Sequence, residues 1–258
     1  MKLFDNFDYI LITGPSGCGK STLLNEILST FPDKAELQKK WTTRPVRPNT
    51  DTYDSKYEYC HVSEQDIDLL DQHGLFFNVT RFKVSNGDTW LYGFPKYIGS
   101  TRDMTRCQVL GCGDIARFCD AYGGDWIPYN CMLINFVMSR DDIREKLIDR
   151  GDNEAELNRR LNDDFLQFNH IDPSALSTLP PDMTKMFHNK NSVVVNVYNS
   201  NYSLSPSDII SILTDILPID DNLTSIIISP RITTVGYPIT DARETHKKLN
   251  FAKNDNLS

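Results

Sequence analysis

The chain has 258 residues, 40% of them hydrophobic and 24% charged, which excludes a disordered or fibrous protein and is ordinary for a soluble globular one. Its formal net charge of −8 argues against a general basic surface, so we expect neither nucleic acid nor a membrane among its partners. Six cysteines without a C-x-x-C pair argue against a zinc site and favour free thiols in a reducing, cytoplasmic compartment.

The N-terminal part of the sequence predicts a strand followed by a helix. Residues 9–13 form a short apolar run that is typical of a buried strand. Beyond it, apolar residues recur at helical spacing from Leu23 to Phe31, and Pro32 ends the helix because proline cannot continue it. The first eight residues carry three charges and no long apolar run, so we expect no signal peptide there.

The segment between this strand and this helix is a complete G-x-x-x-x-G-K-S phosphate loop. Glycines let backbone N–H groups turn toward a phosphate, and the N-terminus of the following helix adds partial positive charge. In such a loop Lys20 is expected to reach the β- and γ-phosphates, and the Ser21 hydroxyl to ligate Mg²⁺. We therefore predict ATP as a ligand and Mg²⁺ as a cofactor. The ATP-binding residues predicted from this loop are Gly14, Ser16, Gly17, Cys18, Gly19, Lys20, Ser21 and Thr22.

The region from residue 39 to about residue 102 mixes polar and aromatic residues and contains turn signals at its prolines and at Asn86-Gly87. Residues 57–62 alternate as a small strand would, and residues 64–73 have the pattern of a helix that a glycine ends. We expect a small mixed insert over the main sheet.

The rest of the chain alternates between predicted strands and predicted helices. The strands are expected at residues 107–110, 131–138, 193–197 and 224–229, with 193–197 as the last parallel strand. The helices are expected at residues 140–168, broken at Gly151, and at 205–217, capped by Ser205 with Pro206 in its first turn. The last dozen residues are polar and are expected to be loose. This alternation predicts an α/β fold with a central parallel sheet covered on both faces.

Two arginines, Arg44 and Arg47, lie three residues apart in the proline-stiffened segment T-T-R-P-V-R-P. The planar fork of arginine suits a dianionic phosphate, and proline reduces the entropy lost on binding. Taken alone, the segment would also fit an exposed basic turn.

Together with the phosphate loop, this segment resembles guanylate kinase, which carries T-T-R-x-x-R soon after its first helix. Further matching motifs follow in the family's order: Y-E-Y before V-S-E-Q-D-I, then G-L-F, then Y-G, and finally an arginine-rich lid with R-G and R-L about ten residues apart. The set is specific although each motif is weak, and the resemblance covers roughly residues 8–217.

The resemblance implies a P-loop NTPase three-layer fold with a small mixed α+β insert that binds the nucleoside monophosphate, and with a helical lid. The implied divisions of the guanylate-kinase-like domain, residues 1–217, are a core at 8–39, 105–140 and 185–217, an acceptor-binding insert at 40–104 and a lid at 141–168. Residues 218–258 form an extension whose role the resemblance does not cover.

The resemblance also implies roles for individual residues. The residues expected to hold the phosphate of the acceptor are Arg44, Arg47, Tyr57 and Tyr92. The catalytic residues expected to neutralise the transferring phosphoryl group are Lys20, Arg44, Arg150 and Arg160, with Lys146 as a point charge where the family has another lid arginine. Asn196 resembles a late residue on the adenine side of ATP. Tyr57 would also fit a half-buried core tyrosine, and the lid arginines a solvated helix face.

The sequence departs from the family where the acceptor base is recognised. Asn78 stands where the family has a glutamate that accepts hydrogen bonds from guanine, and an amide offers one acceptor group where guanine needs two. Lys40-Trp41 replaces a serine before T-T-R, and Phe94 replaces a serine or threonine after Y-G. The family's L-D-x-D becomes L-G-C-G-D, which offsets the acidic residue to Asp114 and leaves open whether it takes over a role near the metal.

These observations lead to a hypothesis and two alternatives. The leading hypothesis is an ATP-dependent (deoxy)nucleoside monophosphate kinase that acts on GMP, dGMP or a related, modified nucleotide. A ribose 1,5-bisphosphate kinase is similar in fold, also lacks the guanine glutamate and has a Y-G-x-P segment like the one at residues 92–95. A guanylate-kinase-like binding module without catalysis is the third hypothesis, although such modules generally lose the phosphate loop. The sequence leaves the acceptor and the oligomeric state open.

Overall fold

The computed structural model describes residues 7–46, 58–84, 87–96, 104–122, 130–167, 192–199, 202–216, 225–229, 233–236 and 246–249. Its centre is an eight-stranded sheet in the order β12-β11-β10-β9-β8-β1-β7-β2. The bounds of its strands are β1 Tyr9–Thr13, β2 Ala35–Leu37, β7 Thr105–Val109, β8 Cys131–Val137, β9 Val193–Tyr198, β10 Ser225–Ile228, β11 Thr233–Gly236 and β12 His246–Leu249. All neighbours from β2 to β10 pair in parallel, which confirms the predicted parallel sheet.

The C-terminal strands enlarge this sheet. The prediction that residues 193–197 form the last parallel strand is wrong, because β10 pairs in parallel with β9 on its outer side. The helix α8 (Pro206–Ile216) connects these two strands as a crossover, which parallel pairing requires. Two antiparallel strands then complete the sheet, and the last of them, β12, includes part of the segment that was expected to be loose.

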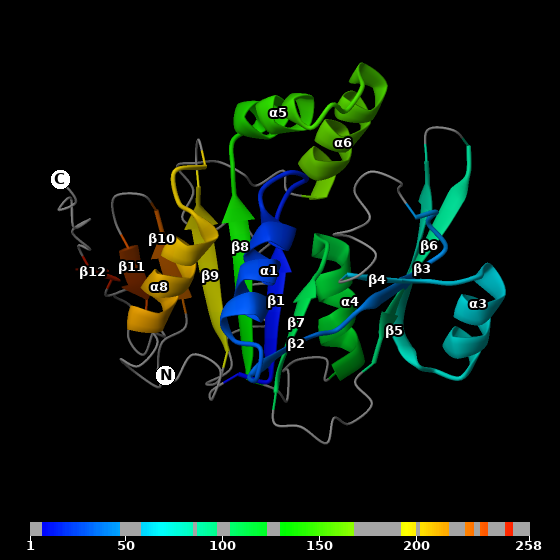
Figure 1. Cartoon of the computed structure of the whole chain (residues 1–258), viewed down its shortest axis with the longest axis horizontal. Coiled ribbons are helices and arrows are strands. Elements are labelled where there is room, and N and C mark those ends of the chain that lie inside the picture. Colours follow the sequence, from blue (N-terminus) through cyan, green and yellow to red (C-terminus); the bar gives the residue numbers. More distant parts are fainter. Residues whose placement is uncertain are drawn as a thin grey trace.

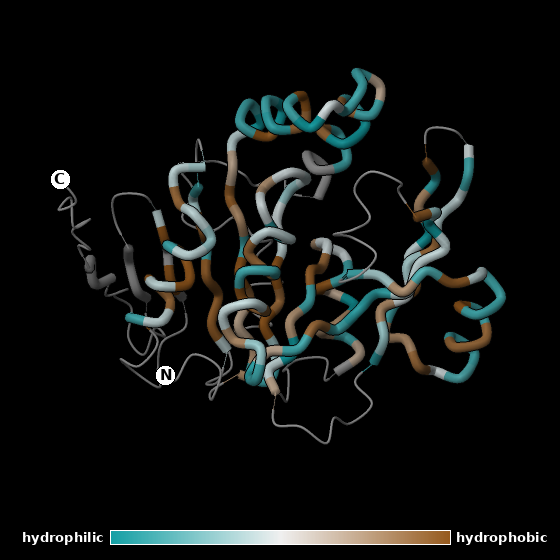
Figure 2. Tube along the Cα trace, in the orientation of Figure 1, coloured by the Kyte–Doolittle hydropathy of each residue, from teal (hydrophilic) through white to brown (hydrophobic). Residues whose placement is uncertain are grey.

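Helices cover both faces of the main sheet (Figure 1). On one face, α1 (Lys20–Thr30) and α8 pack against the side chains that β1, β8, β9 and β10 present to that face. On the other face, α4 (Cys112–Tyr122) packs against Tyr9 and Leu11 through Ile115 and Phe118. The sheet is thus the middle of three layers, as predicted for an α/β P-loop NTPase fold, and its central strands β1, β8 and β9 are predominantly hydrophobic (Figure 2).

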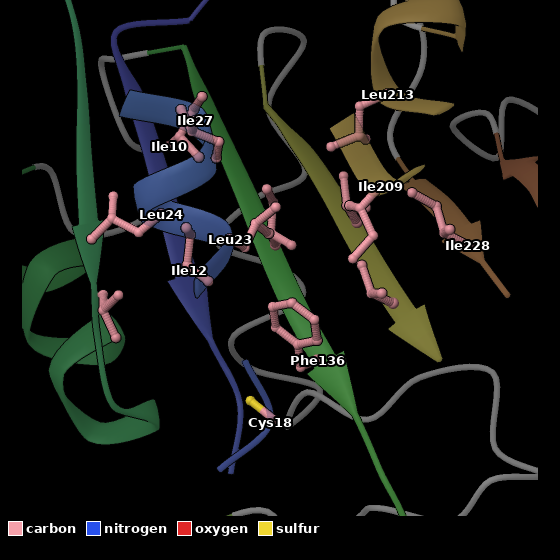
Figure 3. Close-up of a cluster of buried hydrophobic side chains, with 14 of the residues drawn as sticks. Ile10, Ile12, Cys18, Leu23, Leu24, Ile27, Phe136, Ile209, Leu213 and Ile228 are labelled. Carbon is pink, nitrogen blue, oxygen red and sulfur yellow. The ribbon is translucent and has the colours of Figure 1, made fainter. Parts of the chain in front are cut away.

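The largest buried cluster explains why α1 forms where it does. Leu23, Leu24 and Ile27 recur at helical spacing, point from α1 toward the sheet and are at most 1% exposed (Figure 3). They contact the strand side chains Ile10 and Ile12, which are also buried. Burying such side chains stabilises the fold by about 1.5–3 kcal/mol each, so the helix following the glycine loop is held on the sheet by its apolar face.

The helix ends follow local capping rules. Ser205 accepts a hydrogen bond from the Asp208 backbone N–H at 3.1 Å, which confirms it as the cap of α8. In the insert, Ser63 and Asp66 form a capping box at the start of α3 (Glu64–Gln72). Gly151 adopts φ +83° just after α5 (Arg140–Asp149), and this left-handed residue separates it from α6 (Glu154–Gln167) as predicted.

The insert is a separate four-stranded sheet in the order β4-β3-β6-β5 with α3 beside it. The bounds of its strands are β3 Lys40–Thr42, β4 Tyr59–His61, β5 Phe76–Lys83 and β6 Thr89–Pro95. Aromatic packing joins it to the main domain, because Phe77 of β5 lies edge-on to Phe118 of α4 with ring centroids 5.5 Å apart. Within the described residues, no helix combines the length and apolarity needed to cross a membrane.

The packing of β10 can be tested by truncating one side chain. Ile228 is fully buried in the cluster under α8, so Ile228→Ala is expected to lower the free energy of unfolding by about 2–5 kcal/mol. The control Ile148→Ala removes the same atoms from a side chain of α5 that is 51% exposed, and should change stability by about 0.5 kcal/mol or less. Denaturant titrations giving equal effects for both variants would show that the C-terminal strands do not belong to the main sheet.

Candidate active site

One cavity of about 720 Å³ lies where the glycine loop, the insert and the two lid helices meet. The loop after β1, the start of α4 and the helices α5 and α6 all lie at the carboxyl ends of the parallel strands (Figure 1). In open α/β sheets, ligands bind at this edge. The predicted site residues that line this cavity are Gly14, Ser16, Lys20, Ser21, Arg44, Tyr92, Arg150 and Arg160.

The backbone of the loop has the shape of a phosphate cradle. Gly14, Gly17 and Gly19 adopt φ values of +142°, +77° and +100°, which residues with a Cβ rarely adopt. At Gly14 a Cβ would also lie 2.8 Å from the Phe136 Cβ and 2.9 Å from the Cys18 Sγ. Both the conformation and the contact with β8 therefore require glycine at the entrance to the loop.

The side chain of Lys20 is held inside this loop. Its Nζ donates hydrogen bonds to the carbonyl oxygens of Gly14 and Pro15 at 2.9 and 2.6 Å. Because an ammonium has three N–H donors, the group can exchange these carbonyls for phosphate oxygens. Ser21 follows in the first turn of α1 and lines the same cavity.

The side chains of three other residues predicted for ATP do not line the cavity. Cys18 is 1% exposed and packs beneath the loop (Figure 3), while Thr22 lies on the exposed side of α1. Asn196 lies inside β9, where its Oδ1 accepts a hydrogen bond from Asn135 Nδ2 at 2.9 Å. A second asparagine, Asn199, lies at the carboxyl end of β9. Its side chain donates to the Leu204 carbonyl oxygen and accepts from the Leu204 N–H, which stabilises the turn between them.

Tyr202 supports the loop, and sequence reasoning missed it. Its hydroxyl donates to the Gly17 carbonyl oxygen at 3.1 Å, and its ring lies under the Lys146 ammonium at 4.7 Å. Lys146 is thereby placed against Tyr202 and does not line the cavity. No motif marks this tyrosine, which follows β9 in a turn with a left-handed φ of +52°.

On the insert side of the cavity, Arg44 lies against aromatic rings. Its guanidinium carbon is 4.7 Å from the centroid of Tyr59, whose ring meets that of Tyr92 edge-on at 6.0 Å. Sequence reasoning selected Tyr57 of the Y-E-Y motif, but the tyrosine that lines the cavity with Arg44 is Tyr59. Arg47 and Tyr57 lie outside the described residues. Stacking on Tyr59 fixes the plane of the Arg44 fork at the cavity wall.

Asn78 does not line the cavity itself but holds a residue that does. Its Nδ2 donates to Asp114 Oδ1 at 2.8 Å and to Thr80 Oγ1 at 2.9 Å, and Thr80 Oγ1 is 3.1 Å from the same carboxylate oxygen. The Gly111 backbone N–H donates to Asp114 Oδ2 at 3.2 Å. Burial raises the pKa of Asp114, and the charge of Lys40 and these hydrogen bonds oppose that shift.

Two further charged residues from the start of the insert line the cavity. Lys40 is 9% exposed, and Glu58 is 6% exposed with its Oε1 making no hydrogen bond in the structure. Neither was predicted as a site residue. The sequence did offer one indication for Lys40. It lies just before T-T-R, where guanylate kinases have a serine.

The lid arginines are paired with acidic neighbours on the lid itself. Arg160 Nε lies 2.7 Å from Glu156 Oε1 and 3.1 Å from Asp152 Oδ2. Arg159, which was not predicted, contacts Glu156 and also Asp163 at 2.6 Å. Hydrogen bonds from Arg159, together with the charges of both arginines, lower the pKa of Glu156 to about 2. Arg150 contacts Asp152 at 3.3 Å.

Comparison with known proteins gives two kinds of match. A family model described as the viral superfamily 1 RNA helicase core domain matches residues 10–76, a stretch that contains the phosphate loop. Among curated proteins, the guanylate kinase of Shewanella sp. (strain MR-7) is 24% identical over 151 residues, and that of Streptococcus agalactiae serotype III (strain NEM316) is 26% identical over 155 residues. Each match covers 57% of this chain and 66% of the guanylate kinase, just under two-thirds of its length.

The chain is therefore similar to guanylate kinases over 57% of its length, and its phosphate loop lies within the stretch that the helicase model matches. Along the chain, the glycine loop between β1 and α1 is followed by the four-stranded sheet of the insert and then by α5 and α6. This chain departs from the guanylate kinase pattern at the cavity wall that contains Lys40 and Asp114, and at Asn78, which hydrogen-bonds to Asp114.

The loop residues fit a magnesium–nucleotide complex. Mg²⁺ keeps several waters and takes few protein ligands when a nucleotide supplies phosphate oxygens, so the Ser21 hydroxyl is a sufficient side-chain ligand. The described residues contain no group of three or more potential metal ligands, as a metal bound by protein alone would need. Asp114 fits this role poorly, because three hydrogen bonds already engage its carboxylate.

The pairing in this guanylate-kinase-like lid predicts a pH-dependent stability. The pKa of Glu156 is lowered from 4.5 to about 2, so its stabilising effect is present above pH 4.5 and is lost as the pH falls toward 2. We expect Glu156→Gln to lower Tm at pH 7 by about 2–4 °C, the shift that about 1 kcal/mol produces in a chain of this size.

The same measurement below pH 4 should show a smaller difference between the Glu156→Gln variant and the parent. The control Glu154→Gln changes an exposed glutamate in the first turn of the same helix and should leave Tm within about 1 °C at both pH values. A difference for Glu156→Gln that does not shrink on acidification would contradict the charge pairing of the lid.

Proposed function

We propose that this chain is an ATP-dependent (deoxy)nucleoside monophosphate kinase, which transfers the γ-phosphate of ATP to the phosphate of a nucleotide. The observation that carries the proposal is the convergence of Lys20, Arg44 and Arg160 on one cavity from the loop, the insert and the lid. Lys20 would bind the phosphates of ATP, Arg44 the phosphate of the acceptor, and Arg160 the phosphoryl group that is transferred between them. The matched relatives bear the name guanylate kinase, which supports the same class of reaction.

The donor would bind at the loop end of the cavity. The backbone N–H groups around Gly17 and Gly19, and the N-terminus of α1, would surround the β-phosphate of ATP. Lys20 would leave the carbonyl oxygens of its own loop and bind the β- and γ-phosphates. The Ser21 hydroxyl would hold Mg²⁺, which when bound draws charge from the β- and γ-phosphate oxygens.

The acceptor would bind at the insert end, with its phosphate on Arg44. That phosphate is already anionic, so no strong general base is needed. One of its oxygens forms a bond to the γ-phosphorus as the bond from that phosphorus to the β–γ bridging oxygen breaks, giving a nucleoside diphosphate and ADP. Lys20, Arg150 and Arg160 would neutralise the charge that spreads over the transferring group.

The lid would also exclude water from this reaction. Because α5 and α6 lie over the carboxyl ends of the strands (Figure 1), a small movement toward the loop would close the cavity. Exclusion of water suppresses hydrolysis of ATP and strengthens the electrostatic interactions inside.

Lys20→Ala is the sharpest test of the donor site. We expect a loss in kcat of about 10²–10³-fold or more, because a group that stabilises the transferring phosphoryl charge is removed. ADP release with a panel of nucleoside monophosphates as acceptors measures this, and circular dichroism checks that the fold is retained. The control Lys34→Ala removes an exposed lysine beyond α1 and should keep parental kcat. Parental turnover by Lys20→Ala would refute the role of the loop in transfer.

Arg44→Ala tests the acceptor site separately. We expect the KM for the acceptor to rise about tenfold to a hundredfold, the loss that a charge-assisted hydrogen bond of about 1.5–3 kcal/mol implies, with the KM for ATP nearly unchanged. An effect confined to ATP would contradict the assignment. Ribose 1,5-bisphosphate belongs in the acceptor panel, since its sole use would favour a sugar phosphate kinase. Absence of Mg²⁺-dependent ATP binding would favour a non-catalytic module.

A further inference from the structure

The insert end of the cavity carries a cation and a carboxylate that phosphate transfer does not use. Lys40 comes from the first strand of the insert, and Asp114 from the first turn of α4. Both line the cavity, where Lys40 is buried and Asp114 is half-buried. The two residues are therefore available to whatever group of the acceptor lies beyond its phosphate.

Lys40 is 9% exposed and lines the cavity, so its ammonium is accessible to a ligand. Its Nζ lies over the rings of Tyr59 and Phe94, at 5.4 and 5.7 Å from their centroids. It makes no hydrogen bond or ion pair with any other side chain that the structure describes. Aromatic faces offset part of the cost of burying an ammonium, but they satisfy none of its N–H groups as an oxygen atom would. A carbonyl oxygen of a ligand in the cavity would supply such an acceptor.

The Asp114 carboxylate can accept one more hydrogen bond, at its Oδ2 atom. Its Oδ1 is engaged by Asn78 and Thr80, and its Oδ2 accepts one hydrogen bond, from the Gly111 N–H. Each carboxylate oxygen has two lone pairs, so Oδ2 can accept one more N–H. The charge of Lys40 acts on Asp114 although no ion pair joins them. Because both residues line the same cavity, one ligand can contact the ammonium and the carboxylate.

We propose that Lys40 and Asp114 recognise the base of the acceptor nucleotide and select a base that carries an oxo group next to a ring N–H. Lys40 Nζ donates to the oxo oxygen, and Asp114 Oδ2 accepts from the ring N–H. Guanine, hypoxanthine, uracil and thymine present this pair, whereas adenine and cytosine present an amino group next to a ring nitrogen without a proton. The inference rests on the proposed function and names the substrate class of the same site.

Asn78 orients the Asp114 carboxylate through a hydrogen bond. It acts through Asp114 as a positioning residue, because both its N–H donors are used within the cluster. The carboxylate that is missing at position 78 is therefore supplied from α4. An amino base in this site would bring N–H groups against the ammonium and a lone pair against the carboxylate, leaving four polar groups unpaired. Sites built around paired polar groups reject such ligands strongly, by 10²-fold or more as an order of magnitude.

The test compares acceptors at saturating ATP and Mg²⁺, using kcat/KM for GMP, IMP, UMP and dTMP against AMP and CMP. For the parent we expect the best oxo base to exceed both amino bases by about 10²-fold or more. Calorimetric titration of the same nucleotides into the full chain gives the preference in Kd without requiring transfer. Similar kcat/KM and Kd values for oxo and amino bases would overturn the proposal.

Variants identify the residues responsible. Lys40→Met removes the donor and should lower the ratio of oxo to amino bases at least tenfold, while Lys40→Arg, which keeps a cation, should largely retain it. Asp114→Asn turns the acceptor into a donor and should shift the ratio toward amino bases. The control Lys39→Met removes the neighbouring exposed lysine and should leave the ratio unchanged. Circular dichroism and the KM for ATP report whether each variant remains folded.

The outcomes separate this inference from the proposed function. If no nucleoside monophosphate is phosphorylated but oxo bases still bind more tightly, the kinase proposal fails and base recognition stands. If transfer occurs and Lys40→Met lowers kcat/KM equally for every acceptor, Lys40 serves the phosphate or the fold and base recognition fails. If the parent binds none of the nucleotides, both proposals fail.

Discussion

The structure depends on one steric constraint at the start of the chain. Gly14 follows β1 with a φ of +142°, and its Cα approaches Phe136 of β8 so closely that a Cβ would lie 2.8 Å from that side chain. The loop can therefore turn back over the sheet only because a glycine stands there. That turn places the N-terminus of α1, with its unpaired N–H groups, at the carboxyl ends of the strands. The cavity that contains Lys20, Arg44 and Arg160 lies beside this helix N-terminus.

A second contact fixes the far wall of the cavity. The insert could in principle move freely, since its sheet shares no strand with the main one. Phe77 and Phe94 of the insert nevertheless enter the buried cluster under α4, and the Asn78–Asp114 hydrogen bond lies beside them. The apolar contact holds β5 against α4, and the polar contact sets the orientation of the Asp114 carboxylate. The contacts that hold the insert against α4 thus also orient the Asp114 carboxylate in the cavity, so a change in this packing would alter the cavity wall.

Local signals were sufficient for much of the fold. The strand at residues 9–13, the helix ending before Pro32 and the Ser205 cap each depend on neighbours within a few residues, and each was predicted correctly. The site depended on pairs that are distant in sequence. Asp114 meets Asn78 across 36 residues and Tyr202 meets Gly17 across 185, and no spacing rule connects them. Likewise, no local signal showed that Tyr59 would line the cavity or that β10 would pair in parallel with β9.

The balance of charged side chains in the cavity differs from that of the whole chain. Although the formal net charge is −8, the cavity is lined by six basic and five acidic side chains, and most of the acidic ones belong to the lid. Glu156 and Asp152 keep Arg160 extended toward the cavity and also offset its charge. A phosphate that binds Arg160 must compete with the carboxylates of Asp152 and Glu156. A ligand with little negative charge therefore gains little binding free energy from Arg160. A triphosphate together with a second phosphate brings enough negative charge to take over the lid arginines, which would make closure of the lid depend on both substrates being present.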